Sequence, residues 1–123
     1  MADHLRLSPE ALFDSRPLGF HQVQLSHGTR IVHLAGQAAL DRDFAVQAVG
    51  DFKGQMALAL ANIDVCLAAA GVGRTDIAML RLYVVDHDAA LTPVIVEQLV
   101  GFFGADATPP ATLARGRGRS RRR

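Results

Sequence analysis

The sequence predicts one domain of the α+β class, with the element order β-β-α-β-α. The chain has 123 residues, about the size of a single domain with its own core. Two short strand-like segments precede a long amphipathic helix over residues 51–70, and a further strand and helix follow it. Because a helix of about 20 residues lies between strands, at least one connection between strands is helical. Residues 1–114 form the predicted domain, and residues 115–123 form an Arg/Gly tail expected to be disordered.

The two strands predicted before the long helix cover residues 20–25 (FHQVQL) and residues 30–35 (RIVHLA). Residues 26–29 (SHGT) have the composition of a hairpin turn, so we expect these strands to pair with each other. Further toward the N-terminus, Ser8 and Pro9 indicate a brief helix start, with serine as the cap and proline at the first helical position.

The helix over residues 51–70 is the clearest element. Apolar side chains recur in it at spacings of three and four, which places them along one face: Phe52, Met56, Ala59, Ile63, Leu67 and Ala70. Gly71 follows as a residue that readily adopts positive φ and so ends a helix.

The second half of the domain continues with a strand and a helix. Residues 77–85 (IAMLRLYVV) are rich in β-branched and aromatic side chains and predict a buried strand. Thr92 and Pro93 start the second helix and Gly104 ends it. The side chains of this helix expected to face inward are Ile95, Leu99, Phe102 and Phe103.

The composition favours a cytoplasmic protein without a membrane span. No apolar run approaches the ~18 residues that a spanning helix requires, and the start of the chain (MADHLRLSPE) lacks the layout of a signal peptide. The single cysteine, Cys66, cannot form an internal disulfide, which fits a reducing compartment. We expect Cys66 to act as a small buried hydrophobic side chain of the long helix.

The charge is divided unevenly along the chain. Residues 1–114 carry seven basic and 12 acidic side chains, whereas residues 115–123 (RGRGRSRRR) carry six arginines and no acid. This tail has three interpretations: non-specific binding to nucleic-acid phosphates, a solvated disordered terminus, or an altered reading frame or truncation. Nucleic acid is expected as a partner only through the tail.

A series of short motifs occurs in a characteristic order, and together they resemble the RidA/YjgF family, whose members are also called endoribonuclease L-PSP-like. The resemblance covers roughly residues 8 to 113. The matching positions are Gly36-Gln37 after a strand, Gln55 and Asn62 on the long helix, Ala69-Ala70-Gly71 at its end, Asp76, Tyr83-Val84-Val85-Asp86, Phe102-Phe103 and Pro110-Ala111.

The resemblance implies a chorismate-mutase-like fold, with two helices packed on one face of a mixed sheet. It also implies a homotrimer with ligand clefts between the subunits. Family members of the deaminase type hydrolyse reactive enamines and imines. That chemistry needs a cation for the substrate carboxylate and a carboxylate that positions water.

Three positions depart from the family pattern. Thr112 stands where the family has its carboxylate-binding arginine, Ala35 where it has a serine, and Phe20 where it has a tyrosine. The family's terminal strands, which supply an active-site acid, are replaced by Leu113-Ala114 and the tail. The chain therefore resembles a divergent subfamily. It could be an enamine or imine hydrolase, a non-catalytic small-ligand binding protein, or, less favoured, an RNA-interacting protein.

Five residues are candidate ligand-binding positions: Phe20, Ala35, Gln37, Arg81 and Thr112. Arg81 shares a strand face with Met79 and Tyr83 by two-residue alternation. It either replaces the missing cation and binds an anionic substrate, or forms a salt bridge on the sheet face or between subunits. No catalytic residue is assigned, and neither a metal nor a cofactor is expected.

Two histidines near the predicted hairpin raise the question of a metal site. If residues 26–29 form the turn, His33 pairs with Gln22, and His21 lies on the opposite face of the sheet. Two ligands on opposite faces cannot share one ion, so ordinary strand or surface histidines are expected. Gln55 and Asn62 are expected to satisfy backbone groups where the helix meets the sheet.

Overall fold

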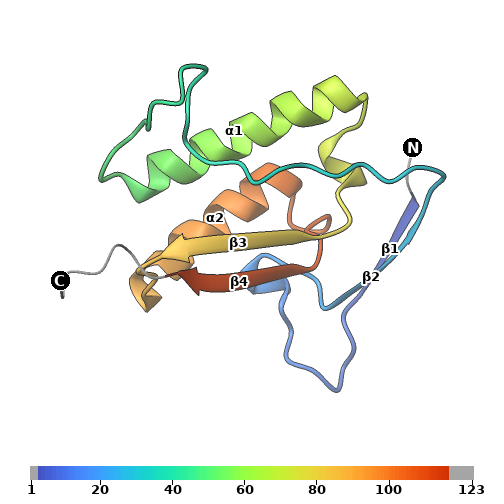
Figure 1. The fold of residues 1–123 in the computed structure, drawn as a ribbon. Coiled ribbons are helices and arrows are strands. Elements are labelled where there is room, and N and C mark those ends of the chain that lie inside the picture. The colour runs from blue at the N-terminus through green and yellow to red at the C-terminus, as the bar shows by residue number, and fades with distance from the viewer. Residues whose placement is uncertain (1–2, 117–123) are drawn as a thin grey trace.

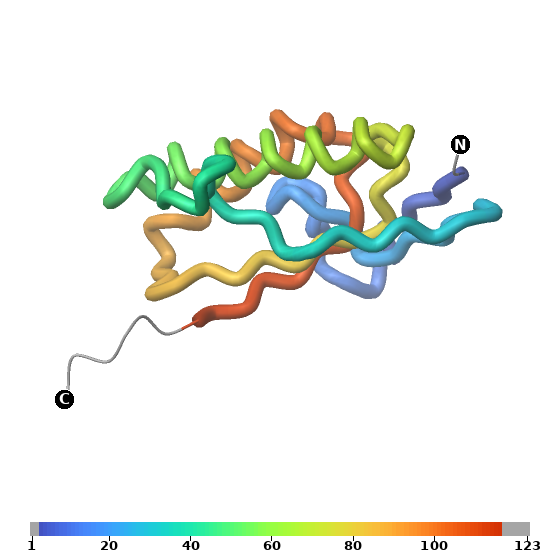
Figure 2. Tube along the Cα trace, turned by 45° about the horizontal axis from the view of Figure 1, so that its top comes forward, coloured from blue at the N-terminus to red at the C-terminus, as the bar shows by residue number. Residues whose placement is uncertain are grey.

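The computed structural model describes residues 3–116, and its strands and helices follow in the order β1-β2-α1-β3-α2-β4. Figure 1 shows α1 and α2 on the same side of β3 and β4, and Figure 2 shows the same layering from a second direction. The bounds are β1 Asp3–Leu7, β2 Val23–His27, α1 Phe52–Ala70, β3 Leu80–Val85, α2 Thr92–Phe103 and β4 Ala111–Gly116, with short 3-10 turns at Arg16–Leu18, Arg74–Asp76 and Ala89–Leu91. In the described part of the chain, neither helix has the length and apolar character needed to cross a membrane.

Both helices form where local signals predict them. The Asp51 carboxylate accepts a hydrogen bond from the Gly54 N–H at 2.9 Å and so caps the start of α1. Gly71 ends the helix with φ at 72°, a left-handed conformation that costs glycine little. Helix α2 begins at Thr92 with Pro93 in its first turn. The predictions for the two helices are therefore confirmed.

The core lies between the helices and β3. It contains Met56 and Leu60 from α1, Val84 from β3, and Ile95, Leu99, Phe102 and Phe103 from α2. All four inward-facing residues predicted for α2 are buried. On α1 the stripe holds Met56 and Leu67, while Leu60, which the predicted stripe did not include, is buried as well.

The predicted hairpin is wrong in its choice of partner. Strand β2 pairs antiparallel with β1, with Leu5 opposite Leu25 and Leu7 opposite Val23. The apolar residues of β1 alternate in phase with those of β2, so both sets lie on one face of the ribbon. Residues 30–35 instead run as an extended segment from the β1–β2 end toward the start of α1 (Figures 1 and 2) and belong to no strand of the described chain.

Two smaller sequence predictions are also wrong. Because residues 30–35 form no strand, the expected pairing of His33 with Gln22 does not occur. No helix starts at Ser8, since the chain makes only a brief turn after β1. Asn62 satisfies backbone groups as expected, but those of the loop before α1 and not of a sheet: its amide donates to the carbonyl oxygens of Ala38 and Leu40.

The strands form two separate two-stranded sheets where the prediction has one mixed sheet. One sheet is the antiparallel β1–β2 ribbon and the other is the parallel β3–β4 pair. The Gln24 side-chain amide joins them by donating to the carbonyl oxygens of Ile77 at 3.4 Å and Ala78 at 3.0 Å. The predicted strand over residues 77–85 accordingly begins only at Leu80.

The chain does form a strand after Pro110. Strand β4 pairs with β3 from Leu80 opposite Ala111 to Val85 opposite Gly116. The expectation that no terminal strand follows is therefore wrong, because backbone pairing at an edge does not require a particular side chain. Arg115 and Gly116, assigned to the tail, belong to this strand. The rest of the predicted tail, residues 117–123, lies outside the described residues.

Candidate functional site

The face of the β3–β4 pair that points away from the helices carries the only two predicted site residues that lie on strands. Along β3, Leu80, Leu82 and Val84 are partly or fully buried, whereas the residues between them are exposed. In a parallel pair, residues opposite each other point to the same face, so Arg81 lies beside Thr112 and Tyr83 beside Ala114. We call this the outer face, and it comprises Arg81, Tyr83, Val85, Thr112 and Ala114.

Arg81 brings to the outer face a positive charge that no ion pair among residues 3–116 neutralises. Within residues 3–116 the ion pairs are Arg16–Asp14, Lys53–Glu97 and Arg74–Asp64, and none involves Arg81. The salt bridge considered for Arg81 is therefore not formed within the described chain. Neighbouring strands lie about 4.8 Å apart, so the side chains of Arg81 and Thr112 leave adjacent positions on the same face.

The other three predicted residues lie elsewhere in the structure. The Phe20 ring is half-buried and packs edge-on against Phe13, with ring centroids 6.3 Å apart. Gln37 turns back on its own segment and donates to the Ala35 carbonyl at 3.2 Å. Among the described contacts, none joins these residues to Arg81 or Thr112. The structure of one chain therefore brings together two of the five candidates.

The outer face is also apolar. Tyr83 is 74% exposed and Val85 58%, although both side chains are large and hydrophobic. The β1–β2 ribbon likewise exposes its apolar side, with Leu5 opposite Leu25. Exposed large apolar side chains that gather on a sheet face favour an interaction site there.

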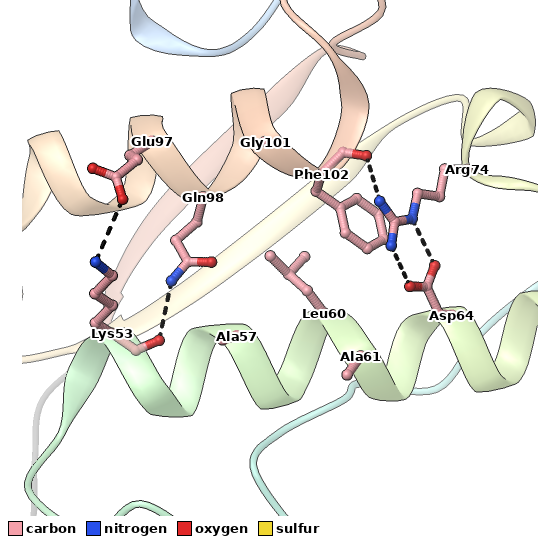
Figure 3. A pocket seen from close by; sticks show the side chains of 10 residues that line it. All are labelled: Lys53, Ala57, Leu60, Ala61, Asp64, Arg74, Glu97, Gln98, Gly101 and Phe102. Carbon is pink, nitrogen blue, oxygen red and sulfur yellow. Dashed lines mark hydrogen bonds and ion pairs between the residues drawn. The ribbon is translucent and has the colours of Figure 1, made fainter.

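A second concave site, which the sequence did not suggest, lies between α1 and α2 (Figure 3). This groove has a volume of about 330 Å³. Leu60 and Phe102 line its centre, while the Lys53–Glu97 pair, 3.5 Å apart, and the Arg74–Asp64 pair flank it. Only tertiary packing brings these pairs together, since neither pair has helical i, i+4 spacing.

The strongest charges in the groove already satisfy each other. The Arg74 guanidinium donates to both carboxylate oxygens of Asp64 and to the Phe102 carbonyl, and it lies 4.0 Å from the centre of the Phe102 ring. Hydrogen bonding from Arg74 lowers the pKa of the Asp64 carboxyl, and the same bond raises the pKa of Arg74. The groove therefore offers a ligand less unmatched charge than the outer face does.

Comparison with known proteins identifies the family. The sequence model described as Endoribonuclease L-PSP matches residues 19–116. A similar solved structure is that of a protein of unknown function from Yersinia pestis, YyfB, of the conserved Rid protein family. It is 28% identical, the alignment covers 98% of this chain and 89% of that one, and the TM-score is 0.82. No curated protein matches the chain. The order of the motifs, the two helices on one side of the β3–β4 pair and both matches lead to one conclusion: the chain belongs to the RidA/YjgF family of endoribonuclease L-PSP proteins.

Proposed function

We propose that this protein binds a small carboxylate-bearing metabolite at the outer face of β3–β4. The observation that carries the proposal is the register of the two strands, which sets the Arg81 guanidinium beside Thr112. A guanidinium donates two parallel hydrogen bonds to a carboxylate, and a hydroxyl adds a third donor. Thr112 stands where the family resemblance implies an arginine, so the cation in this chain comes from the neighbouring strand.

The proposed site is completed by other copies of the chain in a homotrimer. The exposed apolar side chains of the outer face and of the β1–β2 ribbon support this arrangement, because a second copy that covers them removes apolar area from water. Clefts between subunits are also what the resemblance to RidA/YjgF proteins implies. Covering the outer face lowers the local dielectric and strengthens the attraction between Arg81 and an anion.

Binding without hydrolysis is favoured by the groups that one chain contributes. The five residues of the outer face supply a cation and two hydroxyls but no carboxylate. Hydrolysis of an enamine or imine needs a group that positions and deprotonates water, so in our second candidate function the partner subunit provides that acid. An RNA-directed activity is not proposed, because Arg81 is the single basic residue among these five.

Titration of small carboxylates into wild-type and variant protein tests the proposal. Suitable probes are pyruvate, its 2-oxo homologues and the corresponding amides, and calorimetry measures the affinity for each of them. Arg81→Ala is expected to weaken carboxylate binding by about 10- to 100-fold, since a hydrogen bond to a charged group contributes about 1.5–3 kcal/mol. The amides should bind weakly to both proteins.

Arg42→Ala is the matched control, because Arg42 is exposed in the loop before α1 and its removal changes the net charge equally. Its carboxylate affinity should equal that of the wild type. If Arg81→Ala kept the wild-type affinity for every carboxylate while the trimer stayed intact in sedimentation, the proposed site would be wrong. Release of ammonia from a 2-imino acid generated in situ distinguishes the hydrolase from the binding protein.

A further inference from the structure

The segment that leads into β4 is held almost entirely through its carbonyl groups. Its sequence is Thr108-Pro109-Pro110, and the two prolines have no N–H to donate. The Thr108 backbone carbonyl accepts a hydrogen bond from His21 Nδ1 at 2.6 Å. The Pro109 carbonyl accepts one from the His21 backbone N–H at 3.4 Å. The Pro110 oxygen accepts from the Leu80 N–H at 3.0 Å. His21 therefore supplies two of these three donors.

The contact between His21 and Thr108 is buried. His21 is 6% exposed, and Thr108 and Pro109 are fully buried. Because a carbonyl oxygen can only accept, the short contact requires the proton on Nδ1. The Thr108 hydroxyl lies 3.1 Å from the same nitrogen. A buried donor of this kind has no water to replace its partner, so loss of the bond destabilises the folded state.

The loop that carries His21 is held in place by a hydrogen bond and by packing against α2. The buried Ser15 hydroxyl donates to the Phe20 carbonyl at 2.7 Å and so closes the turn before His21. Gly19 has φ at +88° and lies against α2, where an added Cβ would be 3.5 Å from the Leu99 Cβ. Figure 1 shows this loop beside the start of β4. His21 thus links the segment before β4 to a loop that is itself packed against α2.

We infer that His21 is a positioning residue for the Arg81–Thr112 pair, because it fixes the start of β4 and with it the register of the parallel sheet. No tight turn sets this register, since the connection from β3 to β4 runs through α2. A slip by one residue would turn Thr112 to the helix side and away from the outer face. The functional consequence rests on the proposed carboxylate site, whereas the structural part stands without it.

Three variants at position 21 separate the hydrogen bond from simple packing. In His21→Asn the amide nitrogen takes the place of Nδ1, and the bond to Thr108 is kept. In His21→Gln the amide nitrogen reaches only the place of Nε2, and in His21→Leu no donor remains. His33→Gln is the control, because His33 is exposed on the extended segment.

The first measurement is hydrogen exchange at the Leu80 amide, which donates to Pro110, without any ligand. Exchange should be about five- to tenfold faster in His21→Gln and His21→Leu, and close to wild type in His21→Asn and in the control. The second measurement is the affinity for pyruvate, which should fall by a similar factor in the same two variants.

The inference is overturned if the asparagine and glutamine variants behave alike in both measurements, or if His21→Leu matches the wild type. Should the leucine variant fail to fold, the asparagine–glutamine comparison decides: unfolding of the asparagine variant also overturns the inference. If exchange changes as expected but the wild-type protein binds no carboxylate, the proposed function fails and the positioning role of His21 stands.

Discussion

Arg74 is the residue through which α1 holds the C-terminal end of α2, and we expect Arg74→Ala to destabilise the protein. Its guanidinium pairs with Asp64 on α1 and donates to the Phe102 carbonyl at 3.0 Å. That carbonyl is among the last four of α2, which find no N–H donor within the helix and need a donor from outside it. The guanidinium also lies 4.0 Å from the centre of the Phe102 ring.

The three interactions of Arg74 are each small, and they add to a measurable effect. The side chains of Arg74 and Asp64 are 44% and 36% exposed, so water screens their ion pair and it contributes about 0.2–1 kcal/mol. The hydrogen bond to Phe102 contributes about 1 kcal/mol, and a cation over a ring at such a site about 0.5–1 kcal/mol. Arg74→Ala should therefore lower the free energy of unfolding by about 2 kcal/mol, and Asp64→Ala by less than about 1 kcal/mol.

Urea unfolding of the wild type, both single variants and the double variant measures these values, and the cycle isolates the coupling between the two side chains. We expect a coupling energy of about 0.2–1 kcal/mol, smaller than the full effect of Arg74→Ala. Arg16→Ala is a control, because the Arg16 guanidinium also donates to both carboxylate oxygens of an aspartate, Asp14, and no bond to a helix carbonyl is found for it among the described residues. Equal effects of Asp64→Ala and Arg74→Ala would refute the reasoning, since the ion pair would then account for the whole stabilisation.

Three further outcomes follow from the core, the groove and the surface charges. Leu99→Ala should lower the free energy of unfolding by about 2–5 kcal/mol, because Leu99 is 3% exposed, and a thermal transition unchanged from wild type would contradict this. Gly101→Ala should raise the free energy of unfolding by about 0.5–1 kcal/mol, since a Cβ added there meets no atom within 4 Å. A lower midpoint of thermal unfolding than in the wild type would contradict this. The hydrogen bond from Arg16 lowers the pKa of Asp14 from 3.8 to about 2, so its contribution is present above the unfolded-state pKa and disappears as the pH falls toward about 2. An NMR titration should show that low pKa, and Arg16→Gln should return it toward the ordinary value.

The helices could be predicted closely because their signals are local. The Asp51 cap, the apolar stripe and Gly71 all act within a few residues, so they place α1 without any knowledge of its neighbours. Strand partners carry no such signal. Residues 30–35 and Asp3–Leu7 both have strand-like sequences, and the choice of β1 as the partner of β2 depends on packing across the molecule.

The candidate site also combines features that are local in the sequence with features that depend on long-range pairing. Arg81 and Thr112 could each be singled out from the sequence, one by its place within a strand and the other by its place after Pro110-Ala111. Their proximity could not be predicted, because they are 31 positions apart in the chain and only the pairing of β3 with β4 makes them neighbours. His21 looked like an ordinary strand or surface histidine until the structure placed Thr108 against it.

Residue patterns alone were enough to predict the α+β class, the extents of the two helices, the buried face of α2, most of the buried face of α1 and the family resemblance. The helices rest on patterns that repeat every three or four positions, and the family resemblance rests on short motifs in a characteristic order. Three features depend on tertiary packing: which strands pair, the addition of β4 to β3, and the placement of Arg81 and Thr112 side by side on one exposed face. The physical reason is that strand pairing and side-chain juxtaposition join residues distant in the chain, and their free energy depends on every element packed around them.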